Sequence, residues 1–313
     1  MIRRRRTEAK KGGCGGWLML AAIVLGGVWL AVAMLDNGPP PAGPRVSSGL
    51  GPVVAKLKSL DPNCAAPSWL PAAEANATSL QTLVWSPWGR PETGWETYVP
   101  LVGHEIGSSC APETEGFAQA LSRWQASHGL SPDGRMAADA FEAMRVMWLR
   151  RRPFVLAMAT GCPAPPADSA LVLTDPGETY AGQALKLRPG ALDAYRRMVL
   201  QARADSPEIA SDRRALTIIS GYRAPQIGGS DCPPGQTCDR LGRANCSAHR
   251  TGLAVDLYLG AAPGSDPAST GDANRLFQSK TPAYRWLVAN GARFGFLPYP
   301  YEPWHWEWTG EPP

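Results

Sequence analysis

Two short segments near the C-terminal end combine residue types that can hold a catalytic metal ion. The first runs from His249 to Asp256, and the second contains Glu302 and His305. Two imidazoles and one carboxylate suit zinc, which in catalytic sites leaves a fourth position for water and needs a base beside it. Such residues can also serve packing alone, as surface or core histidines and a strand-end aspartate. The added Glu-x-x-His spacing nevertheless favours the interpretation as a metal site.

The residues around Asp256 predict a strand that presents this carboxylate to a cleft. Apolar side chains alternate over residues 253–258, which is typical of a strand with one apolar face. Asp256 would then project from the face opposite the core. Gly252 predicts a turn just before the strand, which would let His249 fold back towards Asp256.

A turn is also needed in the second segment. Pro303 keeps Glu302 out of a regular helix and interrupts strand pairing. Along a straight strand, Glu302 and His305 would point in opposite directions. We therefore expect a turn that lets both face one metal ion.

Three motifs resemble those of VanY-like zinc D-alanyl-D-alanine carboxypeptidases. They lie at Ser220–Arg223, Ser247–Leu257 and Tyr301–His305, in the order found in that family. The resemblance extends over about residues 175–310. It implies one zinc ion held by His249, Asp256 and His305, a zinc peptidase fold, and peptidoglycan stem peptides as substrates.

The resemblance also implies roles for residues that do not bind the metal. Glu302 would be the catalytic base, and Arg223 would steady the substrate carbonyl and its developing oxyanion. We further expect Ser247 and Trp304 to contact the substrate. Arg223 has an alternative interpretation, a structural salt bridge at a strand end.

The chemistry that these roles would perform is peptide hydrolysis. Zinc lowers the pKa of bound water to about 7 and polarises a carbonyl. Glu302 would take the water proton and pass it to the leaving amine. Arg223 is permanently cationic, and a good oxyanion donor contributes about 2.7–4 kcal/mol. Glu307 is a rival for the base role, although a strand residue near the ligands or in solvent is its simpler interpretation.

The N-terminus predicts a membrane anchor. Residues 1–16 form a basic tail, and residues 17–35 are an uncharged, largely apolar stretch that is long enough to span a bilayer. The positive flank should stay in the cytoplasm, so everything after Asp36 should lie on the periplasmic side of a bacterial inner membrane. A cleaved signal peptide is the alternative, because Ala31-Val-Ala33 resembles a processing site.

Charge excludes one class of partner. The basic tail carries a net charge of +5 and the whole chain +4, so the remaining residues are close to neutral. No basic surface is therefore left for nucleic acid. The tail itself has anionic lipid as its natural neighbour.

Six cysteines follow the apolar stretch, and an even number in an oxidising compartment predicts up to three disulfides. Their pairing remains open. They are Cys64, Cys110, Cys162, Cys232, Cys238 and Cys246. A segment between Arg223 and His249 that carries two of them departs from the family pattern and is expected to form part of the cleft wall.

The rest of the chain divides into a linker and two domains. Residues 36–53 are rich in proline and glycine and read as a tether. Residues 54–150 contain two helical patterns separated by a Ser131–Gly134 turn, and they resemble the small three-helix peptidoglycan-binding domain. Residues 165–313 would form the catalytic domain. Helices and strands there mix without regular alternation, which predicts an α+β fold.

These features predict a membrane-anchored zinc metallopeptidase that releases terminal D-alanine from peptidoglycan stems. An endopeptidase of the same fold that cuts L-alanyl-D-glutamate is an alternative. A noncatalytic wall-binding protein is another, although such a protein would not need the base Glu302.

Overall fold

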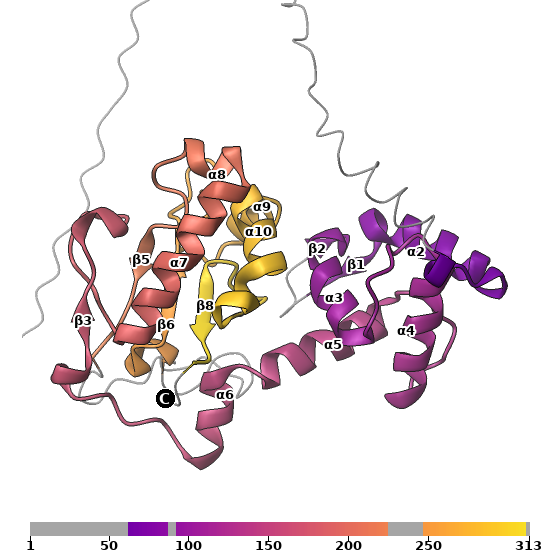
Figure 1. Cartoon of the computed structure of the whole chain (residues 1–313), viewed down its shortest axis with the longest axis horizontal. Helices are drawn as coiled ribbons and strands as arrows, with labels where there is room; N and C mark the ends of the chain where they lie inside the picture. The colour runs from indigo at the N-terminus through magenta and orange to yellow at the C-terminus, as the bar shows by residue number, and fades with distance from the viewer. Residues whose placement is uncertain (1–61, 87–91, 225–246, 311–313) are drawn as a thin grey trace, which may run out of the picture. The chain divides into compact units, whose positions relative to one another are not determined.

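Four antiparallel strands near the C-terminal end form the sheet that carries the candidate ligands. This computed structural model describes residues 62–86, 92–224 and 247–310. The sheet has the strand order β5-β6-β8-β7, and Figure 1 labels the first three of these strands. Its strands are β5 (Ile218–Ser220), β6 (Ala254–Leu257), β7 (Phe296–Pro298) and β8 (His305–Trp308).

The other elements are helices and two small sheets. The α-helices are α2 (Leu70–Thr82), α3 (Val99–Ile106), α4 (Glu115–Ser127), α5 (Ala138–Arg150), α6 (Pro153–Ala157), α7 (Pro189–Asp205), α8 (Pro207–Ser211), α9 (Asp272–Gln278) and α10 (Pro282–Asn290). The 3₁₀ helices are η1 (Pro62–Cys64), η2 (Pro67–Trp69), η4 (Glu96–Tyr98), η5 (Met158–Thr160), η6 (Asp168–Ala170), η7 (Pro176–Glu178), η8 (Ala248–Thr251) and η9 (Gly291–Phe294). The small antiparallel sheets pair β1 (Val84–Trp85) with β2 (Glu92–Thr93), and β3 (Val172–Leu173) with β4 (Lys186–Leu187). An antiparallel sheet with separate helices confirms the mixed α+β class.

One face of the four-stranded sheet is apolar. Val255 and Leu257 of β6 and Trp306 of β8 belong to the main hydrophobic cluster, together with Tyr195 of α7 and Leu287 of α10. Because side chains alternate along a strand, Ala254 and Asp256 must face the other way. The strand predicted over residues 253–258 is thus confirmed, with Asp256 opposite the main core.

The second face of the sheet carries the polar residues. The register of β6 and β8 pairs Ala254 with Glu307 and Asp256 with His305, so these four side chains share one face. α6 contacts β8, and Phe154 of α6 packs against Ala254. Both faces of the central strands are therefore covered, which explains why every residue of β6 is buried.

The helical part before residue 150 follows its predicted pattern. α4 begins after Thr114, whose hydroxyl accepts a hydrogen bond from the Phe117 backbone N–H at 3.4 Å. It ends at Ser127, and Gly129 follows in the left-handed region with φ of 72°.

A disulfide joins Cys64 to Cys110, and Cys162 is disulfide-bonded as well. The prediction of disulfides is confirmed to this extent, while the remaining predicted cysteines lie outside the described residues.

The hydrophobic core does not stop at the predicted domain boundary. The main cluster runs from Phe117 and Phe141 in the helical part to Trp306 in the sheet. The Tyr98 and Tyr284 rings lie 6.3 Å apart, and they join the two parts within one compact unit. The division into domains at 54–150 and 165–313 stays a prediction.

The predicted anchor cannot be compared with the structure. The tail at 1–16, the apolar stretch at 17–35 and the linker at 36–53 all lie outside the described residues. Within the described ranges, no helix combines the length and the apolarity needed to cross a bilayer.

Two local features shape the ends of elements near the sheet. The apolar run at Leu216–Ile219 forms a strand only from Ile218 onward, because Leu216 has a φ of 65° and bends the chain there. α10 ends at Asn290 with Gly291 as its C-cap, and because Gly291 is right-handed the chain continues directly into η9. A Cβ at Gly291 would lie 2.9 Å from the Trp306 ring, and close packing therefore explains this glycine.

Candidate metal centre

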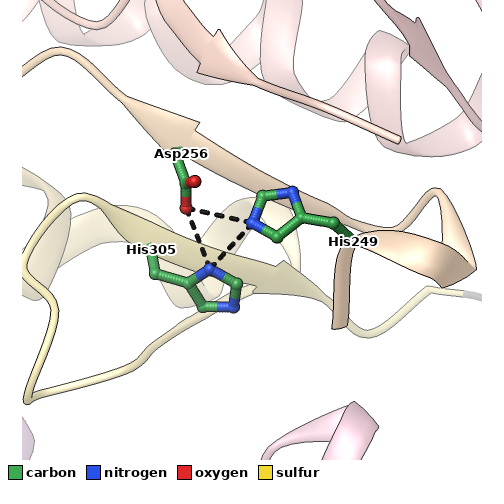
Figure 2. Close-up of side chains that lie close together, drawn as sticks. All are labelled: His249, Asp256 and His305. Carbon is green, nitrogen blue, oxygen red and sulfur yellow. Dashed lines mark hydrogen bonds and ion pairs between the residues drawn. The ribbon is translucent and has the colours of Figure 1, made fainter. Parts of the chain in front are cut away.

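His249, Asp256 and His305 converge on one buried point, as Figure 2 shows. His249 Nε2 lies 3.1 Å from Asp256 Oδ1 and 3.2 Å from His305 Nδ1, and the last two atoms are 2.9 Å apart. Ligand atoms bonded to a tetrahedral zinc ion at about 2.0–2.1 Å lie about 3.3 Å from one another. The three atoms therefore form nearly one face of such a tetrahedron, and the group could hold a metal ion.

The loop before β6 places His249 beside Asp256. η8 begins after Ser247, whose hydroxyl accepts a hydrogen bond from the His249 backbone N–H at 3.2 Å. Gly252 ends it with a φ of 72°, and a Cβ there would lie 2.8 Å from the Leu171 side chain. The predicted turn at Gly252 is confirmed, because only glycine combines this conformation with this close approach.

A backbone carbonyl sets the orientation of the His249 ring. His249 Nδ1 lies 2.7 Å from the Gly221 carbonyl oxygen. A carbonyl can only accept, so Nδ1 must carry a proton. Nε2 is then the ring atom that faces Asp256 and His305, and it is the atom that would bind a metal ion.

Pairing of the two central strands brings the other two ligands together. Asp256 and His305 are directly opposite in the register of β6 and β8. Burial alone would raise the pKa of Asp256, but the imidazoles of His249 and His305 outweigh it and hold that pKa well below its usual range. Asp256 is therefore ionised, as a metal ligand must be.

His305 lies between two carboxylates. Its Nδ1 faces Asp256, and its Nε2 lies 3.2 Å from Glu307 Oε1. Burial would lower the pKa of His305, but hydrogen bonds to Asp256 and Glu307 raise it to about 9. Without a metal, His305 is thus protonated at neutral pH, and a metal ion would have to displace a proton.

Glu307 is buried, and both of its carboxylate oxygens accept hydrogen bonds. Its Oε1 accepts from Arg152 Nε at 2.8 Å and from a second nitrogen of that guanidinium, and its Oε2 accepts from the Phe154 backbone N–H at 2.9 Å. Burial would raise the pKa of Glu307, but Arg152 and then His305 lower it to about 2. Both of its oxygens have partners, so Glu307 fits poorly as the rival base. Arg152 and Phe154 were not among the residues singled out by sequence.

Glu302 lies in the expected turn before β8. Its backbone N–H donates to the Tyr299 carbonyl at 2.9 Å, and its carbonyl accepts from the His305 N–H at 2.8 Å. The carboxylate is half-buried, and no hydrogen bond or ion pair joins it to another side chain of the described residues. The turn is confirmed, and the role of Glu302 as base stays a prediction.

The remaining predicted site residues are Arg223, Ser247 and Trp304. Arg223 is exposed, and its Nη2 donates to Ser247 Oγ at 3.2 Å, while its backbone N–H donates to the His249 carbonyl at 3.2 Å. Trp304 is only 3 % exposed and packs in the main hydrophobic cluster. The structure thus joins Arg223 and Ser247 to the loop of a candidate ligand and puts the Trp304 ring in the core. Their contacts with substrate stay predictions.

Comparison with known proteins agrees with the motifs. Residues 241–311 match the family model of VanY, D-alanyl-D-alanine carboxypeptidase. The resemblance to VanY-like peptidases is confirmed over these residues, which include all three candidate ligands and Glu302. The match does not reach Arg223 or the helical part. No curated protein and no solved structure matches the chain.

Proposed function

We propose that this chain, which carries a VanY-like segment at residues 241–311, is a zinc D-alanyl-D-alanine carboxypeptidase that trims peptidoglycan stem peptides. The convergence of His249, Asp256 and His305 within that segment carries the proposal. Their ligating atoms are 2.9–3.2 Å apart, and all three side chains are buried.

The donor set supports zinc. Two imidazoles and one carboxylate, with a fourth position open, form a common catalytic zinc arrangement. Zinc bound there would supply Lewis acidity, which makes water a good nucleophile near neutral pH and polarises a carbonyl. Two features of the metal-free protein favour metal binding. The Gly221 carbonyl holds His249 in the required tautomer, and the lowered pKa of Asp256 keeps this carboxylate ionised.

The protein residues around the ligands would move the proton and stabilise the charge. Glu302 is three residues before His305, and its half-buried carboxylate has no ion-pair partner among the described residues. It would accept a proton from the attacking water and deliver it to the leaving amine. Arg223 would donate to the substrate carbonyl oxygen as negative charge develops there, and Ser247 would contact the terminal carboxylate.

The decisive experiment is product analysis with the purified full-length chain. Muropeptides with pentapeptide stems are incubated with the zinc-loaded protein, the chelated protein and a zinc-loaded Glu302→Gln variant. We expect zinc-dependent release of free D-alanine and tetrapeptide stems, with little product from the variant. Shortened stems without free D-alanine would indicate the endopeptidase instead, and intact muropeptides with bound chain would indicate a wall-binding protein.

A second proposal concerns location. The apolar stretch at 17–35 supports a single-pass anchor in a bacterial inner membrane, with the catalytic part on the periplasmic side. N-terminal sequencing of the native protein tests it. An intact N-terminus in the membrane fraction supports the anchor, whereas a start near Met34 would indicate a cleaved signal peptide.

A further inference from the structure

One face of α5, together with Arg152 just beyond its end, contacts the Tyr299–Tyr301 loop that leads through Glu302 to His305. Arg145, Leu149 and Arg152 are spaced by four and three residues, so they share this face. The Arg145 guanidinium lies 4.4 Å from the centre of the Tyr301 ring, and Arg152 lies 3.9 Å from the centre of the Tyr299 ring. Leu149 packs against both tyrosines in a separate hydrophobic cluster.

Arg152 extends this contact to the metal centre. It forms a buried ion pair with Glu307, in which the two side chains are 5 % and 2 % exposed. The same carboxylate accepts from the Phe154 backbone N–H and lies 3.2 Å from His305 Nε2. A continuous path therefore leads from the end of α5, through one carboxylate, to a candidate metal ligand.

We propose that Arg152 is a positioning residue for the metal centre. By fixing Glu307 it fixes the His305 imidazole with Nδ1 turned towards Asp256 and His249. The segment that contains α5 and α6 is then a working part of the metal centre rather than a separable attachment. The loss of turnover expected from this inference rests on the proposed function, but the loss of metal affinity does not.

The geometry of His305 explains why an outer carboxylate matters. With Nε2–H donating to Glu307, the ring keeps the tautomer that leaves Nδ1 free for the metal, and it cannot flip without breaking that bond. Glu307 can hold this position only while it is itself held. Without Arg152 this buried carboxylate would lose its guanidinium partner and two of its hydrogen bonds, a loss that is costly in a protein interior.

The rival interpretation is a purely structural ion pair that joins two parts of the chain. It predicts that loss of Arg152 lowers stability and leaves the metal centre unchanged in every molecule that remains folded. Metal affinity and the spectrum of bound metal therefore separate the two interpretations, whereas a melting temperature alone does not.

The test compares Arg152→Met with Arg150→Met in the full-length chain. Arg150 is an exposed arginine at the end of α5, so its variant controls for loss of one positive charge. Zinc affinity is measured by competition with a chelator, and the visible spectrum is recorded with Co²⁺. For Arg152→Met we expect about 10–100-fold weaker zinc binding and an altered spectrum, the usual result of losing such an outer partner. Arg150→Met should match the wild-type chain.

A conservative variant keeps the proposal testable if Arg152→Met does not fold. Arg152→Lys retains the charge but cannot donate to Glu307 from two nitrogens of one guanidinium, so zinc binding should weaken less than in Arg152→Met. Unchanged zinc affinity and an unchanged Co²⁺ spectrum in a folded Arg152 variant would overturn the proposal, whatever happens to stability. If zinc binding weakens as expected but the wild-type chain releases no D-alanine, the proposed function fails and the positioning role stands.

Discussion

Zinc binding to the metal-free protein should release a proton from His305. The pKa of this imidazole is raised to about 9 by Asp256 and Glu307, so it is about 99 % protonated at pH 7. Zinc needs the Nδ1 lone pair and must displace that proton. Apparent zinc affinity should therefore rise about tenfold per pH unit below 9, or about 100-fold between pH 6 and pH 8, which is about 1.4 kcal/mol per unit.

Calorimetry can count this proton directly. Zinc is titrated into the metal-free full-length chain at pH 7 in two buffers with different ionisation enthalpies, and His305 alone should contribute about one released proton per zinc. Glu307→Gln is the matched variant, because it removes the charge of one carboxylate that raises the pKa of His305. In that variant, proton release should begin to fall off at a lower pH. Release near zero at pH 7, or affinity that is flat between pH 6 and pH 8, would refute the reasoning.

The remaining predictions concern chemistry and stability. Glu302→Gln should keep zinc and lose about 10²–10⁴-fold in turnover, whereas His305→Ala should lose the metal itself. Measuring zinc stoichiometry and D-alanine release for both variants separates these effects. A Glu302→Gln variant without zinc would contradict the assignment of Glu302 as base. Arg223→Ala should also keep zinc while kcat falls, and an unchanged kcat would return Arg223 to a structural role. Replacing Cys64 and Cys110 by serine should lower the free energy of unfolding by about 4 kcal/mol, because their disulfide spans 46 residues. Denaturant unfolding measures this loss. An unchanged midpoint would mean that packing alone holds the loop. In the metal-free chain, the raised pKa of His305 stabilises the fold by about 3 kcal/mol, and this contribution is fully present below pH 6.5. It should be lost as pH rises through about 9, so the melting temperature should fall over that range. A melting temperature that rises between pH 6.5 and pH 9 would contradict this prediction.

The proximity of His249 and Asp256 could be predicted because their spacing is local. His249 and Asp256 are joined by one turn and one strand, and both elements have clear signs in the chain: Gly252 for the turn and alternating apolar residues for the strand. Local spacing does not predict the position of His305, because its place opposite Asp256 depends on the pairing of β6 with β8. Family motifs supplied that link, which periodicity alone does not contain.

Arg152 could not be predicted for the same reason. It lies 155 positions from Glu307, and it follows two other arginines, a pattern that resembles an exposed basic run. Only the packing of α5 against the Tyr299–Tyr301 loop makes it a buried partner of a carboxylate. Gly291 shows the same limit, because a helix-closing glycine and a glycine that accommodates the Trp306 ring look alike in the chain.

The pairing of Asp256 with His305 also has a consequence for folding. A slip of one residue between β6 and β8 would exchange the two faces of β8, sending His305 into the apolar core and Trp306 towards Asp256. A chain with this slip cannot bind a metal ion through all three ligands. Metal capture during refolding would therefore distinguish the native register from this slip, and an excess of metal would shift the equilibrium towards the native register.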